Sequence, residues 1–139
     1  YSSAASDVYK RQLEALAYNG IPYRGEKDGV RFVFEDGSRR WETVCRYAPQ
    51  TVMIYGVYPF PVADKGRALH QANQVNATLT RGGLFLSGER IVLRVSADLF
   101  DAYSAQESIT RALEYSAGVM KHFWTQMEAC AKQSGVFQH

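Results

Sequence analysis

The sequence predicts an α+β fold, in which helices pack on an antiparallel sheet in the order α-βββ-α-ββ-α. Three observations lead to this expectation. Two blocks of the chain alternate apolar and polar residues, which is typical of strands with one buried face. Short turn signals rich in Gly, Asp, Ser and Pro separate these strands, so neighbours along the chain should pair antiparallel. Three other stretches place apolar residues at helical spacing.

The first half of the chain supplies one helix end and a three-stranded meander. Apolar residues within 13–17 follow helical spacing, and Asn19-Gly20 ends that helix. Turns then join three strands, of which the third is apolar on both faces except at Gly56. The three predicted strands cover residues 30–35, 41–47 and 51–58.

The second half supplies a helix, a hairpin and a long terminal helix. Asp64 is the expected N-cap of the first of these helices, and Arg81-Gly82-Gly83 its stop. The terminal helix is expected to start at the capping box Ser104 to Glu107 and to end at Gly135. The predicted elements are a helix that follows Asp64 and has its apolar stripe over 68–79, strands over 84–86 and 90–96, and a terminal helix with its apolar face over 109–130. The terminal helix allows an ion pair between Glu128 and Lys132.

Composition and charge exclude several classes of protein. The chain of 139 residues has the length of one domain, and its 13% aromatic residues supply enough core material to argue against disorder. A formal net charge of +2 is too small to indicate a nucleic-acid partner, and no apolar run is long enough to span a membrane. Cys45 and Cys130 are expected to be free thiols in a reducing, cytoplasmic compartment; a disulfide would require their Cα atoms within about 7 Å.

The first twelve residues have an unusual sequence. Residues 2–12 resemble the translation of a transposase-based sequencing adapter, so residues 1–12 are expected to be a non-native segment and carry no functional argument. We therefore expect a single domain over 13–135 and a tail over 136–139. Because the native start is expected to be missing, a lost signal peptide stays open beside the cytoplasmic expectation.

No group of residues predicts catalysis or metal binding. His70 and His122 stand on different helices without a carboxylate one turn away, so surface positions are expected for both. Asp98, Asp101 and Glu107 could serve acid–base chemistry or bind a hard cation, but Asp98 and Asp101 lie in a short loop before a helix N-terminus, which favours a structural role. We expect no enzyme activity, no cofactor and no metal site.

Two surface features have alternative interpretations. Gly82-Gly83 follows a helix rather than a strand, which is the wrong order for a phosphate-binding loop. Arg90 and Arg94 lie on the same face of one strand, where they indicate either a solvated face or a patch for an acidic partner.

Aromatic residues concentrate around the second and third predicted strands. Three helices cannot easily cover a strand that is apolar on both sides, so a second subunit or a bound peptide could cover the rest, and simple core packing is the alternative. We expect a homodimer that captures a partner by β-strand addition or by helix-in-groove binding. The candidate partner-binding residues are Trp41, Tyr47, Tyr55, Tyr58 and Phe60.

Several segments resemble the YbjN family, whose fold is similar to that of type III secretion chaperones. The resemblance runs from about residue 13 to 131 and is carried by residues 26–30, 68–76, 81–86 and 93–98. It implies a type III secretion chaperone-like fold, a dimer that binds extended protein segments, and a regulatory role, since some members are described as sensory transduction regulators. It supplies no catalytic residue.

The sequence thus predicts a non-catalytic protein-binding or chaperone-like regulatory module, with no nucleic-acid or membrane partner. The alternative is a small-molecule-binding sensory domain with a pocket between the sheet and the last helix.

Overall fold

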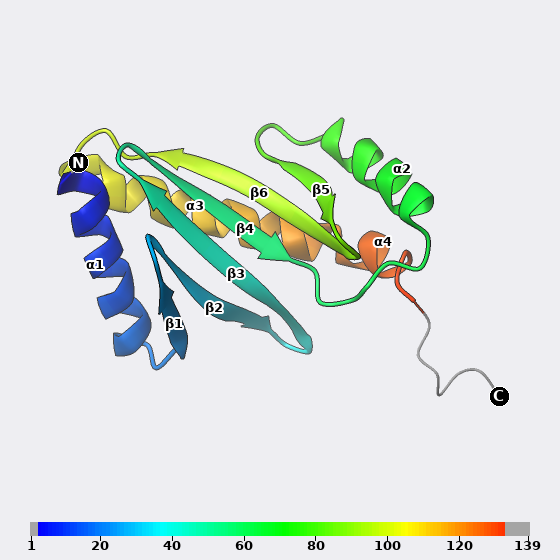
Figure 1. The fold of residues 1–139 in the computed structure, drawn as a ribbon, viewed down its shortest axis with the longest axis horizontal. Coiled ribbons are helices and arrows are strands. Elements are labelled where there is room, and N and C mark those ends of the chain that lie inside the picture. The colour runs from blue at the N-terminus through cyan, green and yellow to red at the C-terminus, as the bar shows by residue number, and fades with distance from the viewer. Residues whose placement is uncertain (1–2, 133–139) are drawn as a thin grey trace.

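The chain forms a six-stranded antiparallel sheet with its helices packed on it, which confirms the α+β prediction. The computed structural model describes residues 3–132 (Figure 1). The sheet order is β1-β2-β3-β4-β6-β5. The elements are α1 (Ser3–Tyr18), β1 (Tyr23–Glu26), β2 (Gly29–Asp36), β3 (Arg39–Ala48), β4 (Thr51–Val57), α2 (Lys65–Asn76), β5 (Gly83–Ser87), β6 (Arg90–Asp98), α3 (Ala102–His122) and α4 (Trp124–Glu128).

The three expected strands of the first half are β2, β3 and β4, and β1 is an additional edge strand. The sequence of β1, Tyr-Arg-Gly-Glu, does not alternate apolar and polar residues, and three of its four residues are exposed. A tight turn, in which Asp28 has φ 58°, pairs β1 with β2. The sequence prediction missed β1 because backbone pairing, not side-chain burial, holds it in the sheet.

The helices lie on one side of the sheet. In Figure 1, α3 runs behind the central strands, and none of the helices that the structure describes lies in front of them. The inner side of α3 buries Ile109, Ala112 and Met120 against the strands, each at most 1% exposed. A Cβ atom on Gly56 in β4 would lie only 3.0 Å from Met120 Sδ, so helix and sheet are in close contact there.

The two ends of α3 differ from the prediction. Asp101 is the N-cap, and its carboxylate accepts hydrogen bonds from Ser104 N at 2.8 Å and Ser104 Oγ at 2.9 Å. The expected capping-box role of Ser104 is therefore wrong, because the helix starts one turn earlier. At the other end the helix breaks at Phe123, and the separate α4 turns Trp124 and Met127 into the core. The expected cap Gly135 and the tail 136–139 lie outside the described residues.

Two further local predictions have different outcomes. Asp64 caps α2 as expected, accepting a hydrogen bond from Arg67 N at 3.1 Å. Lys132 does not pair with Glu128; its Nζ lies 2.8 Å from a carboxylate oxygen of Glu89. Because α4 ends at Glu128 and the chain then turns to bury Cys130, Lys132 does not lie one helical turn from Glu128.

Helix α1 includes most of the adapter-like segment. Val8 and Gln12 of that segment are buried, at 0% and 6% exposure, and Val8 belongs to the main core. The helix ends as predicted: Gly20 has φ 68° and Ile21 N bonds to Leu16 O at 2.9 Å. Packing does not test where a segment came from, so its non-native origin stays a prediction.

None of the helices within residues 3–132 combines the length and the apolar character that crossing a bilayer requires.

Candidate functional site: the helix-free face of the sheet

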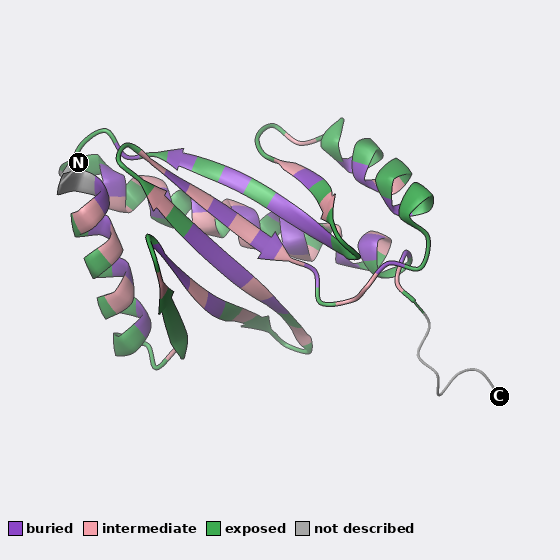
Figure 2. Ribbon diagram, in the orientation of Figure 1, coloured by how far each residue is buried: buried purple, intermediate pink, exposed green. Residues whose placement is uncertain are grey.

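Strand β4 determines where the candidate aromatic residues point. Its residues alternate between buried and half-buried positions from Thr51 to Tyr58, as the purple and pink bands along β4 show in Figure 2. Val52, Ile54 and Tyr58 are fully buried on the side of α3. Tyr55 points the other way, because successive side chains of a strand alternate.

Trp41 and Tyr58 belong to the core, so the prediction that they form a partner surface needs correction. Trp41 is 2% exposed and Tyr58 is 0% exposed. Both rings pack on Trp124 of α4, with centroid distances of 5.8 and 5.4 Å. The Tyr58 hydroxyl donates a hydrogen bond to Met120 O at 2.9 Å, and burial raises the pKa of this phenol above its ordinary value. These rings are covered because α4 folds back onto the sheet.

Tyr47 and Phe60 are half-buried at the margins of the same covered side. Tyr47 meets Tyr9 of α1 edge to face at 5.3 Å, and its hydroxyl donates to Gln12 Oε1. Burial raises the pKa of Tyr47 as well. Phe60 stacks on Tyr58 at 5.5 Å and meets Trp124 edge-on. Of the five candidates, only Tyr55 faces away from the helices.

The helix-free side of the sheet, which we call the open face, carries an apolar patch around Tyr55. Strand pairing places Val44 and Arg94 beside Tyr55, and Val92 beside Val57. Val44 and Val92 are 6% and 5% exposed, yet they are not part of the main core. Neighbouring side chains on the face cover them. The open-face patch consists of Val44, Met53, Tyr55, Val57, Phe85 and Val92.

Arginines surround the open-face patch, and they differ in their partners. Arg31 is paired with Glu26 at 2.6 Å and with Glu42, which lowers the pKa of Glu26 and raises that of Arg31. Arg46 and Arg94 are exposed and have no carboxylate within 4.0 Å in the part of the chain described. The prediction that Arg90 and Arg94 share one face of a strand is confirmed, since Ile91, Leu93 and Val95 between and beside them are buried.

A hollow of about 420 Å³ lies on this face beside Arg94. Met53, Phe85, Arg94 and Ser96 line it together with the backbone of residues 82–84. Gly83 pairs with Arg94 across β5 and β6, and its missing side chain leaves the space open. A Cβ atom at Gly83 would meet nothing closer than Asn76 Oδ1 at 3.6 Å. The hollow therefore lies where an apolar side chain of a partner could enter next to a guanidinium group.

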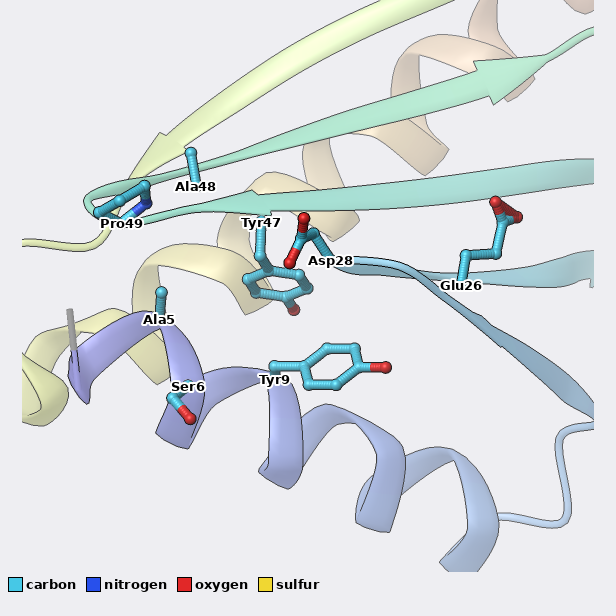
Figure 3. A pocket seen from close by; sticks show the side chains of 8 residues that line it. All are labelled: Ala5, Ser6, Tyr9, Glu26, Asp28, Tyr47, Ala48 and Pro49. Carbon is cyan, nitrogen blue, oxygen red and sulfur yellow. The ribbon is translucent and has the colours of Figure 1, made fainter. Parts of the chain in front are cut away.

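A second hollow, also of about 420 Å³, lies between α1 and the turns at one end of the sheet. Figure 3 shows Tyr9 and Tyr47 within it, Ala5 and Ser6 on the α1 side, and Pro49 at the β3–β4 turn. Its α1 wall falls within the adapter-like segment. Burial raises the pKa of Tyr47, Arg31 holds the Glu26 carboxylate, and Asp28 is the second carboxylate of the lining.

The remaining candidates for chemistry lie apart from one another. His70 is exposed and contacts Gln74 at 3.2 Å, while His122 packs on the ring of Phe123. Asp101 is a helix cap, and Glu107 pairs with Arg111 one turn along α3. Within residues 3–132, no three His, Cys, Asp or Glu side chains stand close enough to hold a metal ion.

Cys45 and Cys130 are buried, unpaired thiols, which is the arrangement expected from the sequence. Burial raises the pKa of Cys45 to about 11, against a weaker opposing effect of the hydrogen bond from Gln12.

Sequence reasoning found the signal of the site and two of its residues, Tyr55 and Arg94, but not the rest. The apolar character of both faces of 51–58 indicated a surplus apolar surface, and the structure places that surplus at Met53, Tyr55 and Val57. Val44, Val92 and Phe85 were missed, because only the register between strands brings them beside Tyr55 and Val57.

Comparison with known proteins shows a likeness in fold. No protein-family model matches the chain, and no curated protein matches it. Among solved structures, the chain is similar to the crystal structure of YbjN, described as "a putative transcription regulator from E. coli". The TM-score is 0.61 with 13% sequence identity, over 86% of this chain and 90% of that chain. At this identity the likeness establishes a shared fold.

Proposed function

We propose that this chain is a non-catalytic, regulatory protein-binding module, and that the open face is its binding surface. The observation that carries the proposal is the open-face patch, which lies in the middle of the sheet and is covered by no helix of residues 3–132. A sheet with one solvated face normally alternates apolar and polar residues. Here Met53, Tyr55 and Val57 interrupt that pattern on three successive outward positions of β4.

The Asn76 side chain favours a partner that binds on the open face over one that adds a strand at the β5 edge. The Asn76 side chain donates to Leu84 O at 3.0 Å and accepts from Leu84 N at 2.7 Å. This carboxamide occupies the backbone groups that an added strand would use, a common way of protecting an edge. A partner that docks across the face does not compete with Asn76.

The regulatory part of the proposal draws support from the fold shared with YbjN, which is described as "a putative transcription regulator". Homodimerisation is a separate part of the proposal. Light scattering of the purified protein tests it: a mass of two chains supports it, and a mass of one chain at every concentration removes it.

A small-molecule sensor is the second function that the sequence allowed. It would use a pocket between the sheet and the last helix. The inner residues of α3 are buried against the strands, and the Met120 side chain packs closely on Gly56. A hollow of about 350 Å³ does lie between Phe34 of β2 and the α3 residues Leu113, Ala117 and Lys121, so the sensor stays the alternative. The open-face patch favours protein binding, which is the function that we put forward.

Selection of peptides from a display library on the purified domain tests the protein-binding proposal. We expect enriched peptides whose binding is lost when Val57, which is half-buried in the patch, is changed to Glu. The matched control is Thr110→Glu, an exposed position on α3 away from the open face. Failure to enrich any peptide, or equal loss with both variants, would contradict the proposal.

A further inference from the structure

We infer that the partner of the open face is an acidic protein segment, whose carboxylates pair with Arg94 and Arg46 while an apolar side chain enters the hollow at Gly83. The inference rests on the proposed function and specifies its partner. Arg94 stands directly beside Tyr55 in the pairing of β4 and β6, and Arg46 stands beside Met53 in the pairing of β3 and β4. Both arginines are exposed, so a partner that covers Tyr55 and Met53 lies next to their side chains.

Covering a charge without pairing it is costly, and this decides the chemistry of the partner. An arginine that loses water must receive a hydrogen-bonding anion, or its desolvation opposes binding. Arg31 already has two carboxylate partners, and Arg90 donates to Pro59 O. Within residues 3–132, Arg94 has no carboxylate within 4.0 Å, and Arg46 has only a longer-range attraction to Glu26, so a segment that covers them has to supply the pairing anions. Paired planar guanidinium and carboxylate groups would also fix the orientation of the segment.

The charge of the whole face agrees with this assignment. Strand register places six arginines and four carboxylates on the open face. A second copy of the chain laid on this face would bring the same excess of arginine, so like charges oppose self-association here. The arginines are at positions 24, 31, 40, 46, 90 and 94, and the carboxylates at 26, 35, 42 and 98.

The hollow indicates which kind of side chain the partner carries next to its carboxylate. Met53 and Phe85 give it apolar walls, and Arg94 forms one side. A segment that alternates acidic and apolar residues matches these walls, because it offers a carboxylate and an apolar side chain to the same face. Nucleic acid also carries anionic groups, but base stacking requires exposed aromatic rings. In the patch Phe85 is an exposed ring, Tyr55 is half-buried among its neighbours, and the other four residues are not aromatic. The patch therefore offers one exposed stacking surface and not the row of rings that successive bases use.

Fluorescence anisotropy with labelled synthetic probes tests the inference. The first probe is a peptide that alternates glutamate with leucine and phenylalanine, the second carries lysine in place of glutamate, and the third is a single-stranded oligothymidylate. We expect binding of the acidic peptide, weakened by salt, and no binding of the lysine peptide. Tighter binding of the oligothymidylate than of the acidic peptide would overturn the inference in favour of nucleic acid.

Three variants locate the binding. Arg94→Glu should weaken binding of the acidic peptide about tenfold, and Arg94→Lys should weaken it less, since lysine keeps the charge but not the planar fork. Gly83→Ala adds to the hollow a methyl group whose nearest neighbour is Asn76 Oδ1 at 3.6 Å, and it should also weaken binding. Arg111→Glu on α3, whose side chain pairs with Glu107, is the control and should have no effect.

The outcomes separate this inference from the proposed function. If peptides selected by display bind through Val57 but carry no acidic residues, the protein-binding proposal stands and the acidic partner is wrong. Equal binding of the glutamate and lysine peptides, or an unchanged affinity of Arg94→Glu, would also overturn the inference. Circular dichroism of each variant confirms that its fold is intact before its affinity is compared.

Discussion

Val52 and Val57 are the same residue type on the same strand, and their substitution tests whether the two faces of β4 differ as described. Val52 is fully buried beneath the helices, whereas Val57 is half-buried on the open face. Changing Val52 to Ala removes two buried methyl groups and leaves a cavity, which should cost about 2–3 kcal/mol. Changing Val57 to Ala should cost about 1 kcal/mol or less, because part of this side chain already meets water.

Urea unfolding followed by tryptophan fluorescence measures the difference, since Trp41 and Trp124 are both buried. The midpoint for Val52→Ala should fall clearly below that of Val57→Ala with an unchanged slope. For a chain of this length, the larger loss corresponds to a drop of about 10 °C in Tm. Equal losses for the two variants would mean that the open face is covered in solution or that the register of β4 is wrong, and the argument for a binding surface would fail.

Three further predictions concern glycines, thiols and a helix cap. Gly29→Ala should destabilise the protein severely in thermal unfolding, because its Cβ would lie 2.4 Å from Cys45 O. Gly118→Ala on α3 meets nothing within 4 Å and should raise the free energy of unfolding by about 0.5–1 kcal/mol. A stable Gly29→Ala protein would contradict the close approach of β2 and β3. With a pKa of about 11, Cys45 should react slowly with a thiol reagent at mildly alkaline pH in the native protein and rapidly after unfolding, and fast native reaction would show that this site opens. Hydrogen bonds from Ser104 lower the pKa of Asp101 below 3.8, so the stability that this cap supplies should be present above pH 3.8 and lost as pH falls through the lowered pKa. Asp101→Ala should therefore be less stable than the unchanged protein at neutral pH and match it in strong acid. Urea midpoints measured across pH would record this difference.

The fold could largely be predicted because most elements carry a local signal. Alternation in 30–35 and 41–47 predicted β2 and β3, and Asp64 predicted the start of α2. The failures have a common cause. Strand β1 is held by backbone pairing, the break at Phe123 depends on where Trp124 fits, and the Asp101 cap competed with an equally good local signal at Ser104.

The candidate site was predictable as a property of one strand but not as a set of residues. A segment that is apolar at every position indicates two apolar faces, and this prediction needs no knowledge of neighbours. It does not say which face the helices cover. Trp41 and Tyr58 were assigned to a partner surface because they are aromatic and nearby, whereas α4 brings Trp124 over both of them.

By itself the sequence determined the α+β class, most of the element order and the excess of apolar residues on β4, since each depends on periodicity within a short stretch of chain. Only the tertiary structure decided that Tyr55 faces outward with Val44 and Arg94 beside it. The physical reason is that side chains on a sheet are neighbours through hydrogen-bonded register across strands, and that register joins residues far apart in the sequence.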